Sequence, residues 1–140
     1  MAKAKQPART LADVLRGLLP TPVREEPSDG GVLLTAGDPG LVAVQVTARG
    51  VAVGVFGVRW DGPHTPTRDD RELCRLTWEE LPAELPEQAA AVLALVQAAE
   101  LIRRAKFRGC RYCQRSMPPE WQHGADVCQG CAERHQGVVH

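Results

Sequence analysis

Apolar residues near the start of the chain recur with a helical period. Five of them occupy the i, i+3, i+4, i+7 and i+8 positions of one helix face, namely Leu11, Val14, Leu15, Leu18 and Leu19. Thr10 and Asp13 have the spacing of a capping box and predict the helix start, while Pro20 predicts its end. The polar residues 21–31 are expected to form a loop, and residues 32–35 a short strand.

In residues 41–58 the apolar side chains recur with a period of two instead. Arg49-Gly50 divides this segment and predicts a β-hairpin of residues 41–48 and 51–58 with a two-residue turn. One hairpin face is β-branched and is expected to pack against a helix; it carries Val42, Val44, Val46, Val51, Val53 and Val55. The other face has small and polar side chains and allows two interpretations. It either accepts a ligand or partner, or it is covered by the first helix.

The second half of the chain begins with a predicted loop and continues into a long helix. Residues 61–71 contain Gly, Pro and charged side chains typical of a loop, and residues 73–76 suit a fourth strand. Thr77 and Glu80 have capping-box spacing again. A helix is expected over residues 86–107, because an apolar stripe recurs there at helical spacing: Val92, Leu95, Val96, Ala99 and Ile102.

This order of elements predicts an α+β fold. We expect a short antiparallel sheet of three to four strands packed on one long and one short helix, followed by a C-terminal four-cysteine zinc finger. The expected organisation is a flexible tail at residues 1–9, an α+β domain at 10–107 and a zinc-finger module at 108–140. The apolar runs are shorter than the roughly 20 residues that span a bilayer, so no membrane partner is expected.

Four of the five cysteines lie in two Cys-x-x-Cys pairs separated by fourteen residues: Cys110, Cys113, Cys128 and Cys131. Two such pairs can place four thiolates around one tetrahedral Zn²⁺. Four cysteines close the coordination sphere, which predicts one structural zinc rather than a catalytic one. A redox dithiol and an iron–sulfur cluster are the alternatives. Cys74 is remote from both pairs and is interpreted as a buried apolar side chain.

The residues around the two pairs differ. The first pair lies in a Gly109-to-Gln114 segment that suits a tight knuckle, whereas Ala132-to-His135 follows the second pair and could form a helix. A knuckle followed by a ligand pair that opens a helix resembles the treble-clef class of zinc fingers. Two knuckles would instead resemble a zinc ribbon. The resemblance covers only the last quarter of the chain and implies a metal site, not an activity.

Charge is balanced overall but segregated along the chain. The 140 residues contain 17 Lys and Arg and 17 Asp and Glu, so no global field favours nucleic acid. A basic stretch nevertheless spans the helix end and the first knuckle: Arg103, Arg104, Lys106, Arg108, Arg111 and Arg115, with Tyr112 among them. It either contacts the phosphates of DNA or RNA, with Tyr112 and Trp121 stacking on bases, or merely solvates the helix end.

We therefore expect a small bacterial, cytoplasmic zinc-finger protein that binds nucleic acid or a nucleic-acid machine. The bacterial origin is inferred from an Arg-rich, Asn-free composition, and the compartment from paired cysteines without a signal peptide. One alternative is a protein-interaction adaptor that uses the acidic residues 68–87. A second is a treble-clef nuclease, for which His123 and Asp126 are the nearby pair; otherwise no catalytic set suggests an enzyme.

Overall fold

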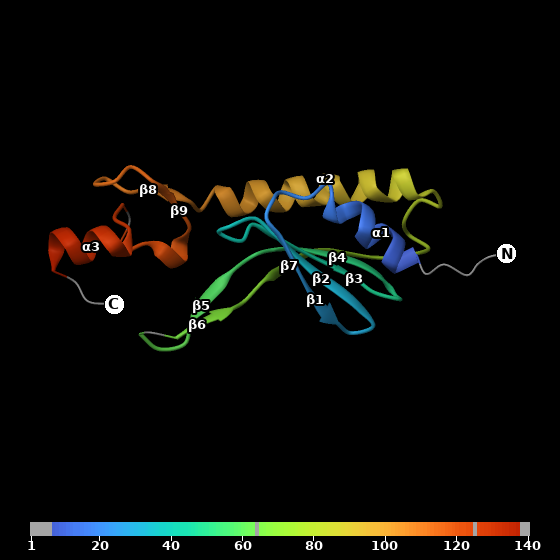
Figure 1. Cartoon of the computed structure of the whole chain (residues 1–140), viewed down its shortest axis with the longest axis horizontal. Helices are drawn as coiled ribbons and strands as arrows, with labels where there is room; N and C mark the ends of the chain where they lie inside the picture. The colour runs from blue at the N-terminus through green and yellow to red at the C-terminus, as the bar shows by residue number, and fades with distance from the viewer. Residues whose placement is uncertain (1–6, 64, 125, 138–140) are drawn as a thin grey trace.

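The computed structural model describes residues 7–63, 65–124 and 126–137 (Figure 1). Its main sheet is antiparallel, with the strand order β1-β2-β3-β4-β7. The strands are β1 (Val23–Ser28), β2 (Gly31–Ala36), β3 (Val42–Val46), β4 (Gly50–Val55) and β7 (Arg71–Thr77). The α+β class is confirmed, but this sheet has five strands rather than three to four.

Strand β1 occupies part of the segment that was predicted to be a loop. All six of its residues pair with β2, from Val23 opposite Ala36 to Ser28 opposite Gly31. The strand lies at the edge of the sheet and its four central residues are exposed, so it needs no apolar alternation. An edge position also tolerates Pro27, which lacks an N–H group to donate. The loop prediction was wrong because composition alone cannot distinguish a polar edge strand from a loop.

Strands β3 and β4 form the predicted hairpin, with a displaced turn. Val46 lies opposite Val51, and the Thr47 N–H donates to the Gly50 carbonyl at 2.9 Å, so Ala48-Arg49 forms the turn instead of Arg49-Gly50. The pairing shifts by two positions, and a shift of two keeps each side chain on its face. All six valines of the predicted face are accordingly buried.

Helix α1 (Pro7–Arg16) starts three residues before the predicted N-cap at Thr10. Of the predicted 1–9 tail, residues 1–6 lie outside the described part of the chain, and the rest belongs to α1. Leu11 and Leu15 are fully buried, and α1 contacts α2, β2 and β3. Because α1 and α2 lie on the same side of the sheet (Figure 1), the first helix does not cover the small-residue face.

Helix α2 (Leu85–Arg104) covers the valine face as predicted and ends three residues before the predicted residue 107. Val92, Val96 and Ala99 from the expected stripe are buried against the sheet. Among the described residues α2 is also long and apolar enough to cross a membrane by length and composition alone, which the sequence interpretation had not anticipated. A core helix meets the same criterion, and the buried face of α2 is part of the core.

A second, two-stranded sheet extends from the end of β4. It consists of β5 (Val58–Trp60) and β6 (Pro66–Arg68), within and beside the segment predicted as a loop. The predicted fourth strand is confirmed as β7, which pairs with β4. Thr77 and Glu80 exchange the reciprocal bonds of a capping box, at 2.9 and 3.3 Å, but they close a turn rather than open a helix.

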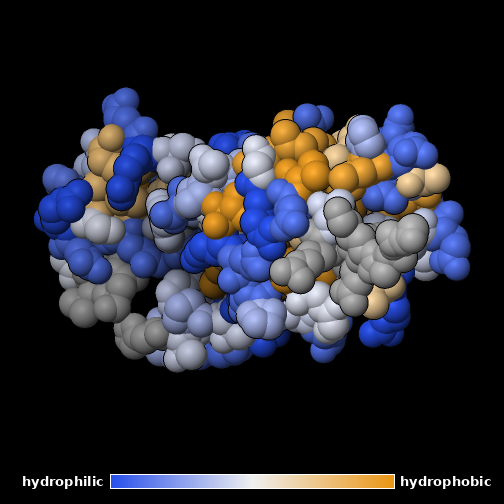
Figure 2. Space-filling model, turned by 45° about the vertical axis from the view of Figure 1, so that its right-hand side comes forward, coloured by the Kyte–Doolittle hydropathy of each residue, from blue (hydrophilic) through white to orange (hydrophobic). Residues whose placement is uncertain are grey.

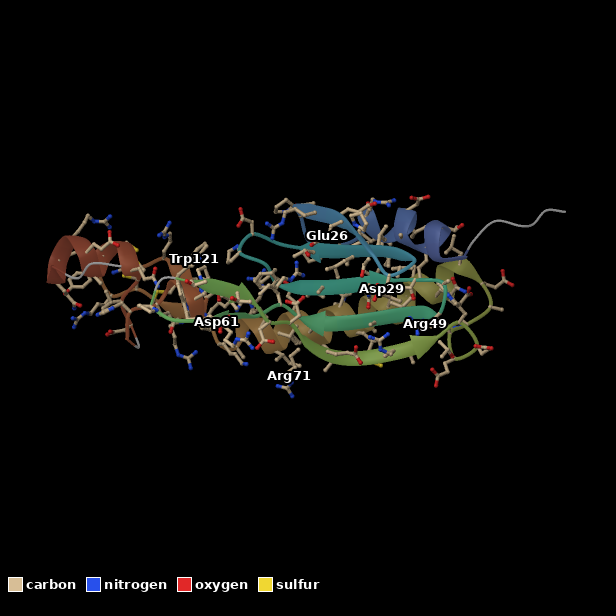
Figure 3. All side chains as sticks on the ribbon, turned by 90° about the horizontal axis from the view of Figure 1, so that it is seen from below. Glu26, Asp29, Arg49, Asp61, Arg71 and Trp121 are labelled. Carbon is tan, nitrogen blue, oxygen red and sulfur yellow. The ribbon has the colours of Figure 1, made fainter. Side chains whose placement is uncertain are left out.

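The opposite face of the main sheet has no helix over it among the described residues (Figure 3). Ala43, Ala52 and Gly54 make this face flat, and charged side chains surround them. A shallow hollow of about 170 Å³ lies there, lined by Leu33, Ala43, Gln45, Ala52, Val53, Gly54, Asp70 and Glu72. No described helix covers the small-residue face, yet Ala43 and Ala52 are only 5% and 8% exposed because neighbouring side chains shield them.

Candidate metal centre and the surface around it

The first cysteine pair lies in the turn of a short hairpin. Strands β8 (Arg108–Gly109) and β9 (Ser116–Met117) pair, and the Cys110 N–H donates to the Arg115 carbonyl at 2.9 Å. Gln114 donates back to the Cys110 carbonyl at 2.8 Å and has a positive φ of 65°. This left-handed residue closes the turn so that both sulfurs of the pair face the same side.

The second cysteine pair opens a helix. Cys128 is the N-cap of α3 (Gln129–Gln136), and its Sγ accepts the Cys131 N–H at 3.4 Å. Cys131 lies in the first helical turn, where N–H groups have no partner within the helix. Gly137, at φ 70°, ends the helix in the left-handed conformation. A sulfur at the N-cap therefore both caps the helix and faces the first pair.

These two local structures bring four sulfurs together. The Sγ atoms of Cys110, Cys113, Cys128 and Cys131 all lie within 4.8 Å of one another. Cys113 and Cys128 have Sγ atoms 3.9 Å apart, close to the roughly 3.8 Å edge of a tetrahedron with 2.3 Å metal–sulfur bonds. A disulfide would need about 2.05 Å. The four cysteines could hold one metal ion, as the spacing predicted.

The protein environment favours thiolates at two of these positions. Burial would raise the pKa of Cys110, but the N–H groups of Cys113, Cys128 and Tyr112 outweigh burial and lower that pKa to about 5. The Cys131 N–H lowers the pKa of Cys128. Burial, together with the three neighbouring sulfurs, raises the pKa of Cys131 to about 12. Four ionised thiolates therefore need a cation at the centre.

Two arginines supply positive charge beside the sulfurs. The Arg134 Nη2 donates to the Cys131 Sγ at 3.2 Å. A hydrogen bond to Cys128, followed by the charge of Cys113, raises the pKa of Arg115. Four thiolates around a divalent ion carry a net charge of −2, which these guanidinium groups offset. The sequence predicts Arg115 as a nucleic-acid contact and gives a signal for Arg134 only in its i+3 spacing from Cys131.

Arg103, the first residue of the predicted basic stretch, is almost completely buried. It is 3% exposed, donates from Nε to the Gly40 carbonyl at 2.9 Å, and forms a two-pronged ion pair with Glu120 of the module. Its guanidinium also lies over the Phe56 and Phe107 rings. Arg103 follows Val92, Val96 and Ala99 at helical spacing, which could have revealed its inward position. Sequence analysis did not identify Glu120.

The remaining residues of the basic stretch lie at the surface. Arg104 pairs with Glu100, and Arg108 donates to the Ala105 and Phe107 carbonyls, so both also stabilise the end of α2. Lys106 is exposed.

The module's own cation and aromatic side chains form a cluster. Arg111 lies over the Tyr112 ring at 5.0 Å, and Tyr112 stacks on His135 of α3 at a centroid distance of 4.3 Å. The structure thus brings Arg111, Tyr112 and His135 together.

A groove separates the module from the end of the main sheet. It has a volume of about 310 Å³, and three aromatic side chains line it, Phe56, Trp60 and Trp121. Trp60 and Trp121 are 42% and 38% exposed, although large aromatic side chains are usually well buried. Figure 3 shows Trp121 at the end of the molecule that also carries Asp61 and the β5–β6 hairpin. A second hollow, lined partly by Arg115, shares Trp121 and Gln129 with this groove.

His123 and Asp126, the pair that a nuclease would need, lie in the loop between η1 (Pro119–Trp121) and α3. Their main chains hold the loop to the metal site: the Asp126 carbonyl accepts the Arg111 N–H at 2.8 Å, and the His123 N–H donates to Val127 at 2.6 Å. Both residues thus have a structural role through their backbones.

Comparison with known proteins gives no match. No family model, no curated protein and no solved structure is significantly similar to the chain. The description of the metal centre rests on the geometry of its four cysteines.

Proposed function

We propose that the four cysteines bind one structural Zn²⁺ in a site of the treble-clef class. A hairpin knuckle followed by a helix-opening pair supports this class over a zinc ribbon. Zinc is the usual occupant of a closed, tetrahedral four-thiolate site without redox chemistry. Few apolar side chains are buried in the module besides the cysteines, namely Met117, Pro118, Val127 and Ala132. The metal would then supply most of the free energy that folds the module.

The function that the geometry supports best is binding of DNA or RNA through the surface of this module. The observation that carries the proposal is the exposed set of Lys106, Arg108, Arg111 and Tyr112, held beside the metal and continuous with the end of α2. Arg103 does not belong to this surface, because it is buried in an ion pair with Glu120. Arg115 contributes through its position beside Trp121, at 6.0 Å from that ring.

Fluorescence anisotropy with labelled oligonucleotides tests this function directly. Affinity should fall steeply with salt, because each neutralised phosphate releases counterions. The variant R108A/R111A should reduce the slope of log K against log salt by about 1.4 to 1.8 and leave zinc content unchanged. Arg115 is left intact in this variant because it bonds a cysteine sulfur. R49A/R71A, which removes two exposed arginines of the body, is the matched control. Absence of binding at low salt would contradict the proposal.

The aromatic groove favours single strands as the substrate. Unstacked bases can lie on exposed aromatic faces, each worth about 1–3 kcal/mol. Trp60→Ala and Trp121→Ala should each weaken single-stranded binding by that amount and leave duplex binding unchanged. Trp78 serves as the control position for these two variants, because its Nε1–H donates to the Thr47 carbonyl at 3.1 Å inside the body. Equal losses for single and double strands would exclude base stacking in the groove.

A protein partner is the second candidate, favoured by the shallow hollow on the small-residue face of the sheet, which no described helix covers. The acidic residues beside it are largely paired within the chain, Asp70 with Arg68 and Glu72 with Arg75. Contact on this face would therefore depend on shape rather than net charge. Gln45→Arg would obstruct the hollow. The Gln45→Arg variant should keep its affinity for nucleic acid. If instead the protein forms a complex with another protein that is insensitive to salt and is lost in Gln45→Arg, the chain is an adaptor.

A further inference from the structure

The outward side of α2 carries a regular seam of exposed residues. Six exposed residues alternate at spacings of three and four, as do the a and d positions of a coiled coil: Glu87, Ala90, Ala94, Gln97, Leu101 and Arg104. Leu101 is 71% exposed, which is more than any other large apolar side chain of the described residues. In Figure 2 apolar surface gathers along the upper edge of the molecule, where α2 lies in Figure 1.

This seam leaves α2 without a partner on one side. Only 28% of an 18-residue window of α2 is buried in the single chain, although that window is apolar enough in composition to cross a membrane. The sheet and α1 account for the inner face. The outer face carries alanines, which permit close approach of another helix, and it ends in one acidic and one basic side chain.

The residues of the seam are complementary to the same residues taken in the reverse order. If a second α2 is laid antiparallel across the first, every seam residue meets a compatible one. The resulting contacts are Glu87 with Arg104, Ala90 with Leu101, and Ala94 with Gln97, each occurring twice by two-fold symmetry. Opposite charges thus meet at both ends, whereas a parallel pair would place Glu87 against Glu87 and Arg104 against Arg104.

We propose that two copies of this chain associate through antiparallel α2 helices across this seam. The seam from Glu87 to Arg104 is about 26 Å long at 1.5 Å per residue, shorter than the helices of extended coiled coils. One helix pair buries less than a standard interface of roughly 1,200–2,000 Å², so the dimer is weak and concentration-dependent. Because each α2 leads into its own module, antiparallel pairing places the two metal modules at opposite ends (Figure 1).

Sedimentation equilibrium of the full-length, metal-loaded protein tests this dimer. The native chain should show a monomer–dimer equilibrium up to several hundred micromolar protein. Glu87→Arg and Arg104→Glu should each raise the dissociation constant about tenfold, because each places like charges together at both ends. The double variant E87R/R104E should restore the native dissociation constant. Glu79→Arg, a charge reversal at an exposed position outside α2, is the control.

The central position gives an independent variant. Ala94→Arg places a long charged side chain at the centre of the seam and should leave the protein monomeric with an unchanged circular dichroism spectrum. A native chain that is monomeric at every concentration would overturn the proposal. So would a dimer that Ala94→Arg does not affect, or single charge reversals that the double variant fails to rescue.

Discussion

The α+β body and the C-terminal module are stabilised in different ways. The body has an extended apolar core in which the valines of β3 and β4 pack against α1 and α2. The module's buried cluster is small and consists half of cysteines, Cys110, Cys128 and Cys131. A domain this small rarely folds on apolar burial alone. The body therefore has a core large enough to fold on its own, whereas we expect the module to depend on a bound metal.

A buried ion pair nevertheless joins the two regions. Arg103 at the end of α2 and Glu120 in the module form an ion pair whose side chains are 3% and 10% exposed. The Gly40 carbonyl takes the remaining Nε donor, so the guanidinium bridges sheet, helix and module. This contact fixes the module's position but does not supply its internal stability.

Loss of the metal should have the largest effect and should separate the two regions. In Cys110→Ser, hydrogen-exchange mass spectrometry should show the module's amides exchanging at unprotected rates, because metal binding energy is folding energy there. Amides of β3 and β4 should stay protected. Cys74→Ser, a change outside the cluster, should leave exchange unaltered. A module that stays protected in Cys110→Ser would show that it does not need the metal.

Loss of the Arg103–Glu120 ion pair should have the next largest effect. Glu120→Ala leaves the Arg103 charge buried and unpaired, which typically costs about 3–5 kcal/mol. Urea unfolding followed by tryptophan fluorescence measures the loss. Arg104→Ala removes an exposed pair with Glu100 and should cost no more than about 0.5 kcal/mol. Equal effects of the two changes would mean that body and module are not coupled through Arg103.

Acid should affect the module before the body. The folded-state pKa of Cys110 is lowered from 9.0 to about 5, so its thiolate contributes fully to stability above pH 9. That contribution shrinks as the pH falls and is gone below about pH 5. Protons compete with the metal for all four thiolates, so the affinity for zinc should fall as the pH falls. Competition with a chelator at a series of pH values measures this affinity, and an affinity that does not change with pH would contradict thiolate ligands.

The smallest expected effect concerns the knuckle. Gln114 has a φ of 65°, a conformation that costs a residue with a Cβ atom about 1 kcal/mol or more. Gln114→Gly should leave zinc affinity equal or slightly higher in competition with a chelator. Gln114→Val should lower it by roughly 1–2 kcal/mol, because β-branching worsens the strain. An unchanged affinity in the valine variant would indicate that the turn relaxes.

The sequence predicts those features of the two regions that depend on the spacing of neighbouring residues. The metal ligands follow from two Cys-x-x-Cys pairs, and α2 and the β3–β4 hairpin follow from their apolar periods. Strand β1 was missed because an edge strand can be polar on both faces. Turn positions depend on backbone geometry, so the hairpin turn was predicted one residue late.

Long-range contacts could not be predicted from the sequence, for a different reason. Arg103 and Glu120 are seventeen residues apart, and only the folded module brings the carboxylate to the end of α2. The groove between Trp60 and Trp121 likewise needs the relative placement of three segments. Neither contact has a spacing rule, although the helical position of Arg103 was a usable signal.

Zinc K-edge X-ray absorption of the purified full-length protein tests the metal assignment, because it reports the identity and distance of the ligands. We predict one zinc per chain with four sulfur scatterers at about 2.3 Å. Absence of zinc, or nitrogen or oxygen atoms among the four ligands, would contradict it.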